Sequence, residues 1–228
     1  MNESKVALIH ATPLAMQPVS AAFERIWPRV QRMNLLDDRL SQDLAAAGDM
    51  TDAMVRRIVN LARYATVHGG ASGILFTCSA FGPAIEEAAR VVGVPTLKPN
   101  EAMFDEALEF CVQAAGEPRI GLLTTFAPAA DSMCEELLVM ARGKKQAFRM
   151  ERACASGAME ALNAGDTATH DRLVLEAART LAGCDVLMLG QFSMARCQAQ
   201  VADVTRRPVL TSPDSAVRRL QAVLAASS

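Results

Sequence analysis

A cysteine between two hydroxyl residues is the first feature of the sequence that could carry chemistry. Cys78 lies in the segment GILFTCSAFG, between Thr77 and Ser79, where the apolar run of residues 73–76 stops. A turn from a strand into a helix offers backbone N–H groups and the positive end of the helix dipole to an anion, and this field lowers the pKa of a thiol. We therefore expect Cys78 to act as a thiolate base and Thr77 and Ser79 to contact its substrate; a buried, inert cysteine is the alternative.

Polar side chains also follow two other apolar runs. His10 and Thr12 come after residues 5–9, and Thr124, Thr125 and Phe126 come after residues 119–123. Hydroxyl groups and free backbone N–H groups in such loops can hold a carboxylate without a metal. The alternative for the threonines is ordinary turn capping. His10 could act as an acid/base by its type, but a histidine next to a strand more often has a structural, hydrogen-bonded role.

The elements that must position these residues alternate along the chain. Apolar runs typical of strands buried on both faces of a parallel sheet occupy residues 5–9, 73–76, 119–123 and 185–189. Between them, apolar stripes predict helices, for example over residues 52–69 and 169–183. Alternating strands and helices predict an α/β fold with a mostly parallel sheet.

The chain also repeats itself. The segments GILFTCSAFGPAIEEAARVVGVPTL and DVLMLGQFSMARCQAQVADVTRRPVL each contain an apolar strand, a small polar turn, an Ala-rich helix and a strand led by proline. Cys78 precedes Pro95 by 17 positions and Gln191 precedes Pro208 by the same 17, so Cys78 and Gln191 occupy equivalent positions. We predict two pseudo-symmetric, doubly wound lobes, each with a parallel four-stranded sheet. The N-terminal lobe would contain residues 1–99 plus 209–228 and the C-terminal lobe residues 100–208, with the ligand site in the cleft between them.

Composition and charge exclude several classes of protein. Apolar residues make up 51% of the chain and charged residues 21%, which excludes a disordered or fibrous protein. The formal net charge of -2 and the dispersed basic pairs give no support to nucleic-acid binding, and no apolar run approaches the length of a membrane span. The first residues are too acidic for a signal peptide, so we expect a cytoplasmic protein. Six cysteines and three histidines form no cluster of metal spacing, so we expect no metal.

Five segments taken together resemble the aspartate/glutamate/hydantoin racemase superfamily. In chain order they are ALIHATP, ILFTCSAFG, VPTLKPNEA, GLLTTFAP and VLMLGQFSMA. The resemblance implies a cofactor-independent enzyme of two α/β lobes, commonly a homo-oligomer, in which each lobe brings a cysteine to a small carboxylate substrate. One thiolate removes the proton α to the carboxylate and the opposite thiol returns one, while N–H and hydroxyl donors stabilise the intermediate. Cys78 matches the first cysteine, and Thr124 and Thr125 match the loop that holds the carboxylate.

The second turn departs from the family pattern Gly-Cys-Thr. It reads Gly190-Gln191-Phe192-Ser193, and the side chain of Gln191 can form hydrogen bonds but cannot exchange a proton near neutral pH. We expect Gln191, Phe192 and Ser193 to contact the substrate. Cys197 is a candidate substitute for the missing cysteine, although it aligns with a position inside the following helix.

The sequence is compatible with three functions. The first is a racemase or isomerase of an amino-acid-like or dicarboxylate substrate with Cys78 as acid/base, in which Lys98 could reach a second carboxylate. The second is an arylmalonate-type decarboxylase that uses Cys78 as its sole proton donor. In that enzyme Phe126 and Phe192 would line an apolar pocket for the departing carboxylate; core packing is the alternative for both. The third is a catalytically silent carboxylate-binding protein.

Overall fold

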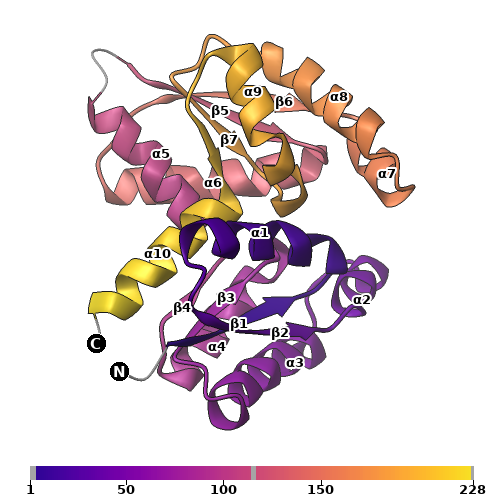
Figure 1. Ribbon diagram of the computed structural model, residues 1–228, viewed down its shortest axis with the longest axis vertical. Helices are drawn as coiled ribbons and strands as arrows, with labels where there is room; N and C mark the ends of the chain where they lie inside the picture. The colour runs from indigo at the N-terminus through magenta and orange to yellow at the C-terminus, as the bar shows by residue number, and fades with distance from the viewer. Residues whose placement is uncertain (1–3, 114–116, 227–228) are drawn as a thin grey trace. The chain divides into compact units, whose positions relative to one another are not determined.

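The computed structural model describes residues 4–113 and 117–226 of the chain, which forms two compact units (Figure 1). The first unit contains the chain up to Pro99 and again from Ala216 onward, and the second contains Asn100–Ser215. Each unit holds one parallel four-stranded sheet with helices on both faces. The predicted α/β class and the two parallel four-stranded sheets are confirmed.

The sheet of the first unit has the order β2-β1-β3-β4. Its strands are β1 (Lys5–His10), β2 (Gln31–Leu36), β3 (Gly73–Phe76) and β4 (Thr96–Leu97). All neighbours are parallel, and Ile9 of β1 is paired with Phe76 of β3. The residues that follow β1 and β3 therefore emerge side by side at the carboxyl edge of this sheet.

Helices bury both faces of the first sheet. They are α1 (Met16–Ile26), α2 (Leu40–Ala47), α3 (Asp52–Arg63), α4 (Gly82–Val92) and the C-terminal α10 (Ser212–Ala226). Ile9, Ile74 and Phe76 pack with the apolar stripes of α3 and α4, and Figure 1 shows α1 on the other side of the strands. Leu220 and Leu224 of α10 approach Gly73 of β3 so closely that a Cβ there would lie 3.0–3.1 Å from their methyl groups.

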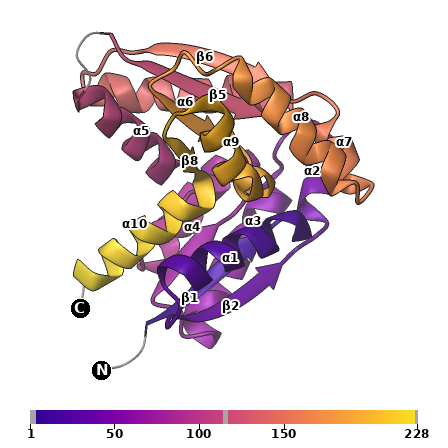
Figure 2. The same ribbon diagram turned by 45° about the horizontal axis from the view of Figure 1, so that its top comes forward.

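The second unit has the matching order β6-β5-β7-β8. Its strands are β5 (Arg119–Thr124), β6 (Arg149–Cys154), β7 (Val186–Leu189) and β8 (Val209–Thr211). Its helices are α5 (Glu101–Gln113), α6 (Ala127–Gly143), α7 (Ala158–Asn163), α8 (Thr167–Arg179) and α9 (Gln198–Thr205). One core joins the sheet to α5 and α6, and another joins its opposite face to α8 and α9 (Figure 2).

The internal repeat extends to the backbone of the two turns. Cys78 and Gln191 each follow the third strand of their unit and each has extended dihedral angles (φ -129°, ψ 119° and φ -120°, ψ 146°). Each is followed by a 3-10 turn, η3 (Ser79–Phe81) or η4 (Phe192–Cys197), and then by a helix. The two residues are therefore equivalent in structure as well as in sequence.

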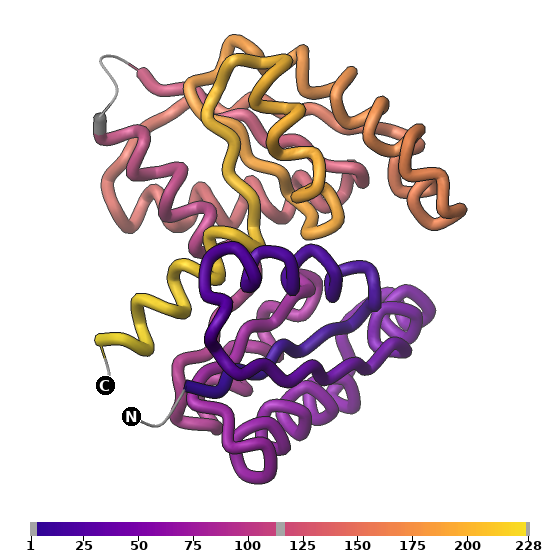
Figure 3. Tube along the Cα trace, viewed as in Figure 1, coloured from indigo at the N-terminus to yellow at the C-terminus, as the bar shows by residue number. Residues whose placement is uncertain are grey.

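The end of the second unit differs from the predicted boundary. β8 pairs in parallel with β7, so residues 209–215 belong to the second unit and not to the first. In this pairing the Leu187 N–H donates to the Pro208 carbonyl at 2.9 Å. The chain therefore passes from the second unit to the first within α10, between Ser215 and Ala216. The trace in Figure 3 follows the chain as it leaves the first unit after Pro99 and returns from Ala216.

Helix boundaries differ slightly from the predictions. The helix predicted over residues 52–69 consists of α3, capped by the Thr51 side chain, and a π-helical turn over Tyr64–His68. The helix predicted from residue 169 begins at Thr167 and ends at Arg179. Across residues 4–113 and 117–226, no helix combines the length and apolar character needed to cross a membrane.

Candidate active site

Cys78 lies at the carboxyl edge of the first sheet, directly after β3. Its side chain is half-buried and lines a cavity of about 10 Å³, which is room for about one water molecule. Most of the remaining lining is apolar, and it comes from Ile9, Ala11, Leu40, Ile58, Phe76 and Phe81, with His10 as the polar member. The thiol therefore has a largely apolar environment.

In this environment the pKa of Cys78 is shifted in the direction opposite to the prediction. Burial raises the pKa of the Cys78 thiol, while the backbone N–H of Ala80 and the hydroxyl of Ser41 act in the opposite direction without reversing the shift. The helix dipole contributes little because α4 begins at Gly82, after the 3-10 turn, and the dipole field falls off within one turn. The prediction of a lowered pKa is wrong, and Cys78 is a neutral thiol near pH 7.

His10 and Thr77 form a buried polar pair beside Cys78. His10 is fully buried, its Nδ1 lies 2.9 Å from Thr77 Oγ1, and its Nε2 lies 2.9 Å from Asn34 Oδ1. Burial lowers the pKa of His10, and the hydrogen bond to Asn34 acts in the opposite direction without reversing the shift. The ring is therefore neutral near pH 7. A neutral ring that donates from Nε2 to Asn34 accepts at Nδ1 from the Thr77 hydroxyl. Both residues thus hold the ends of β1, β2 and β3 together, and His10 has the structural role expected for a histidine next to a strand.

The other residues predicted at this edge have different environments. Thr12 caps the 3-10 turn Pro13–Ala15, its hydroxyl accepting from the Leu14 N–H at 3.4 Å, which is the capping role given as its alternative. Ser79 is exposed. Lys98 donates to Glu86 Oε1 at 3.0 Å, so an ion pair engages its ammonium group.

Gln191 occupies the matching position in the second unit, after β7, and its amide has a defined orientation. Gln191 Oε1 accepts from the backbone N–H of Thr125 at 2.9 Å and lies 3.4 Å from the Thr125 hydroxyl. A backbone N–H can only donate, so the amide oxygen must face Thr125 and the NH2 group must face away. Among the described residues Gln191 Nε2 has no hydrogen-bond partner, and the side chain is partly exposed. The second turn therefore leaves the N–H groups of Gln191 without a partner among the described residues.

Thr124 lies behind this turn. It is fully buried, and within the described residues its hydroxyl has no hydrogen-bond partner. A Cβ added to Gly190 would lie 3.0 Å from Thr124 Cγ2 and 3.0 Å from Met133 Sδ, so a side chain there would force these neighbours to shift. In this structure the side chain of Thr124 packs against Gly190, the residue directly before Gln191.

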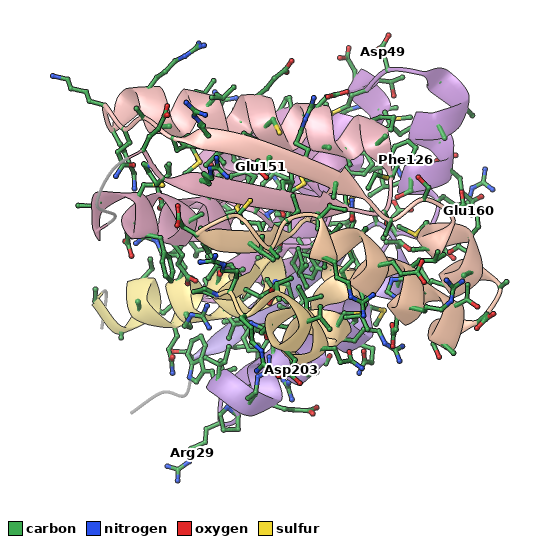
Figure 4. The ribbon with its side chains drawn as sticks, turned by 90° about the horizontal axis from the view of Figure 1, so that it is seen from above. Arg29, Asp49, Phe126, Glu151, Glu160 and Asp203 are labelled. Carbon is green, nitrogen blue, oxygen red and sulfur yellow. The ribbon has the colours of Figure 1, made fainter. Side chains whose placement is uncertain are left out.

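The aromatic residues of the second unit divide into one exposed and one buried side chain. Phe126 is 58% exposed and precedes α6 at the carboxyl edge of β5 (Figure 4). Phe192 is buried, as is Ser193. Phe126 is thus the aromatic side chain of the predicted pair that can touch a ligand, while Phe192 packs into the unit.

Cys197 does not replace the missing cysteine of the second turn. It ends η4, is fully buried, and its thiol donates to Asp171 Oδ1 at 3.2 Å. Burial and the neighbouring Asp171 carboxylate raise its pKa to about 12. The thiol is directed to α8 and not to the carboxyl edge of the sheet.

The comparison with known families decides what kind of protein carries this pair of turns. The model of the Asp/Glu/Hydantoin racemase family matches residues 14–220. The chain belongs to the Asp/Glu/hydantoin racemase family. Its membership associates it with cofactor-independent racemase chemistry. The comparison with curated protein sequences gave no match.

Solved structures show the same fold at low sequence identity. A glutamate racemase isoform from Bacillus anthracis has a TM-score of 0.69 at 13% identity, over 100% of this chain and 84% of that chain. Allantoin racemase from Klebsiella pneumoniae has a TM-score of 0.68 at 18% identity, over 99% and 89%. A glycine-to-cysteine mutant of arylmalonate decarboxylase in a sulfate-associated form has a TM-score of 0.60 at 17% identity, over 98% and 94%. Racemases and a decarboxylase thus share the fold of this family member.

Sequence reasoning missed two partners of the candidate residues and one hydrogen bond between two candidates. Ser41 lies beside the Cys78 thiol but 37 positions away in sequence, and its hydroxyl now donates to the Ala11 carbonyl at 3.0 Å. Asn34 binds His10 from the edge strand β2, and Thr125, itself a candidate residue, orients Gln191 from the loop directly after β5. Each of these contacts joins residues that are far apart in sequence, so no local sequence pattern could predict it.

Proposed function

We propose that this family member is a one-thiol enzyme that releases CO2 from a substituted malonate and protonates the resulting carbanion on one face. Cys78 is the proton donor, and Gln191 is the hydrogen-bond donor to a carboxylate oxygen of the substrate. The observation that carries the proposal is the orientation of Gln191, whose oxygen is bound by Thr125 and whose NH2 group is left for the ligand. A fixed N–H donor stabilises negative charge but supplies no proton to the second face.

The neutral state of Cys78 supports the same reaction. A racemase needs a thiolate to remove a weakly acidic Cα proton, whereas a decarboxylase needs a protonated thiol to deliver one. Burial raises the pKa of Cys78, so the thiol holds its proton near pH 7. Ser41 can turn its hydroxyl from the Ala11 carbonyl toward sulfur when the thiolate forms, because a hydroxyl has one proton to donate.

The step balances without a cofactor. The bond between Cα and the departing carboxylate breaks, and its electron pair stays on Cα and the remaining carboxylate as an enediolate. The N–H groups of Gln191 stabilise the enediolate oxygen, and the Cys78 S–H transfers its proton to Cα. The resulting thiolate takes a proton from solvent. Contact with the Phe126 ring would favour loss of the unpaired carboxylate, because a carboxylate held against an apolar surface is poorly solvated.

Incubation in D2O with substituted malonates, amino acids and hydantoins tests the proposal. We expect CO2 release from a malonate and one deuterium in a single product enantiomer. Cys78→Ala should abolish the reaction, and Cys111→Ala, a half-buried cysteine of α5, should leave it unchanged. Activity that survives in Cys78→Ala would contradict the assigned proton donor.

Racemisation is the second candidate, because family membership favours it. It would show as deuterium exchange at Cα of recovered amino acid or hydantoin without CO2. This outcome would require Cys78 to ionise when substrate binds and a second proton carrier other than Gln191. The absence of both exchange and CO2, together with saturable carboxylate binding, would favour a silent binding protein.

A further inference from the structure

The second unit gathers three side chains with metal-ligand chemistry away from the Gln191 amide. His170 and Asp171 are in α8, and Cys197 ends η4. One ligand atom from each residue lies within 4.8 Å of the other two. Two of the separations are short, since His170 Nδ1 is 2.7 Å and Cys197 Sγ is 3.2 Å from Asp171 Oδ1.

The cluster is buried and faces solvent at one side. His170 and Cys197 are fully buried, and the Asp171 side chain is 20% exposed. Arg196 Nε also lies 3.2 Å from Asp171 Oδ1, and its side chain is 43% exposed. His170, Cys197 and Arg196 thus converge on one carboxylate oxygen, and the exposed Arg196 side chain has room to turn away into water.

We propose that His170, Asp171 and Cys197 bind a divalent cation, with Zn²⁺ the best match. A mixed set of imidazole nitrogen, carboxylate oxygen and thiolate sulfur is typical of zinc, which prefers tetrahedral coordination. Bond lengths of about 2.0–2.3 Å place the ligand atoms of such a site roughly 3.3–3.6 Å apart. The two short separations need to open by less than about 1 Å, and the third, between His170 and Cys197, is at most 4.8 Å, so rotation of the side chains can reach the required arrangement.

The exchange of protons for zinc balances in charge. Cys197 releases its S–H proton to solvent, and the imidazole proton of His170 moves from Nδ1 to Nε2, leaving Nδ1 as a ligand. The two negative charges of the thiolate and the Asp171 carboxylate then neutralise Zn²⁺. Arg196 leaves Asp171 for solvent, and water enters from the exposed side of Asp171 as the fourth ligand.

The bound cation would cross-link α8 to the end of η4, the turn that begins directly after Gln191. A cation there would stabilise the fold of the second unit without touching the substrate. The inference is independent of the proposed function, because no residue of the cluster takes part in proton transfer to Cα.

Titration of the metal-free protein with Co²⁺ under anaerobic conditions tests the site. We expect one equivalent to give the visible bands of tetrahedral Co²⁺ and a thiolate charge-transfer band, both lost on addition of Zn²⁺. Zn²⁺ should also raise the Tm of the metal-free protein. Cys197→Ser should lose the charge-transfer band and the Zn²⁺-dependent shift in Tm, whereas Cys154→Ser, a half-buried cysteine of β6, should keep both.

Two outcomes would overturn the inference. One is wild-type protein that shows no thiolate band and no shift in Tm with Zn²⁺. The other is a thiolate band that persists in Cys197→Ser. If Cys197→Ser does not fold, as judged by circular dichroism, Asp171→Asn serves instead, because it keeps the shape of the side chain and its acceptor oxygen but loses the charge that zinc requires. Unchanged Zn²⁺ affinity in folded Asp171→Asn would equally overturn it.

Discussion

At the scale of single residues, the ionisation of Cys78 decides between acid and base. We expect the rate of Cys78 alkylation by iodoacetamide to keep rising with pH above the ordinary pKa of a cysteine thiol, because only the thiolate reacts and burial raises the pKa of Cys78. Mass spectrometry of the labelled peptide across the pH range measures the midpoint. The unfolded protein is the control, and its midpoint should be lower.

A midpoint below that of the unfolded protein would contradict the raised pKa of Cys78. It would support the lowered pKa that the strand-to-helix turn predicted from sequence. The position of the midpoint is compared, and not the absolute rate, because limited access to the half-buried thiol slows alkylation at every pH.

The orientation of Gln191 gives a second prediction at this scale. We expect Gln191→Glu to lower kcat/KM for the substrate by about 10²–10³, since one carboxylate oxygen still accepts from Thr125 N–H while the other replaces an N–H donor with a negative charge. Steady-state kinetics measure the loss, and Tm should change little. Gln191→Met is the control, because it removes the acceptor as well and should also lower Tm. Full activity in Gln191→Glu would show that its N–H groups do not bind the substrate.

At the scale of elements, Gly190 follows β7 at a point where a Cβ would force Met133 or Thr124 to shift. We expect Gly190→Ala to reduce the free energy of unfolding by about 1–3 kcal/mol, because the new methyl group would lie 3.0 Å from Met133 Sδ and Thr124 Cγ2. Each kcal/mol lowers Tm by about 2–4 °C in a chain of this size. Differential scanning calorimetry measures the change.

Gly143→Ala is the matched control for this prediction. Gly143 is the last residue of α6, and a Cβ there meets no atom within 4 Å. Alanine favours the helix over glycine, so its Tm should stay level or rise slightly. Equal destabilisation by both substitutions would mean that the close contact at Gly190 is not what matters.

The sequence predicted the apolar strands better than the two edge strands of mixed composition. β1, β3, β5 and β7 are continuous apolar runs and were located directly. The edge strands β2 (QRMNLL) and β6 (RMERAC) mix charged and apolar residues because much of each is exposed, so no run marked them. At the site, the repeat predicted the equivalence of Cys78 and Gln191, whereas the raised pKa depends on packing around the thiol that no local pattern contains.

At the scale of the whole molecule, the repeat predicts that the two turns serve one substrate. We expect Gln191→Cys to introduce racemisation, measured as loss of optical purity in the product or as Cα deuterium exchange, because a second thiol would supply a proton to the other face. Gln191→Ser is the control, since a hydroxyl of similar size does not exchange protons near neutral pH. A folded Gln191→Cys protein with an optically pure product would contradict the pairing of the turns.

The return of the chain to its first unit has a consequence for biosynthesis. The first sheet needs Leu220 and Leu224 of α10 over Gly73, yet α10 is translated only after the whole of Asn100–Ser215. The second unit is continuous in sequence and can complete its core as it emerges from the ribosome. The first unit, although translated earlier, keeps part of one sheet face uncovered until α10 arrives. Nascent chains that stop before residue 216 are therefore the species in which this face is open to chaperones and to aggregation.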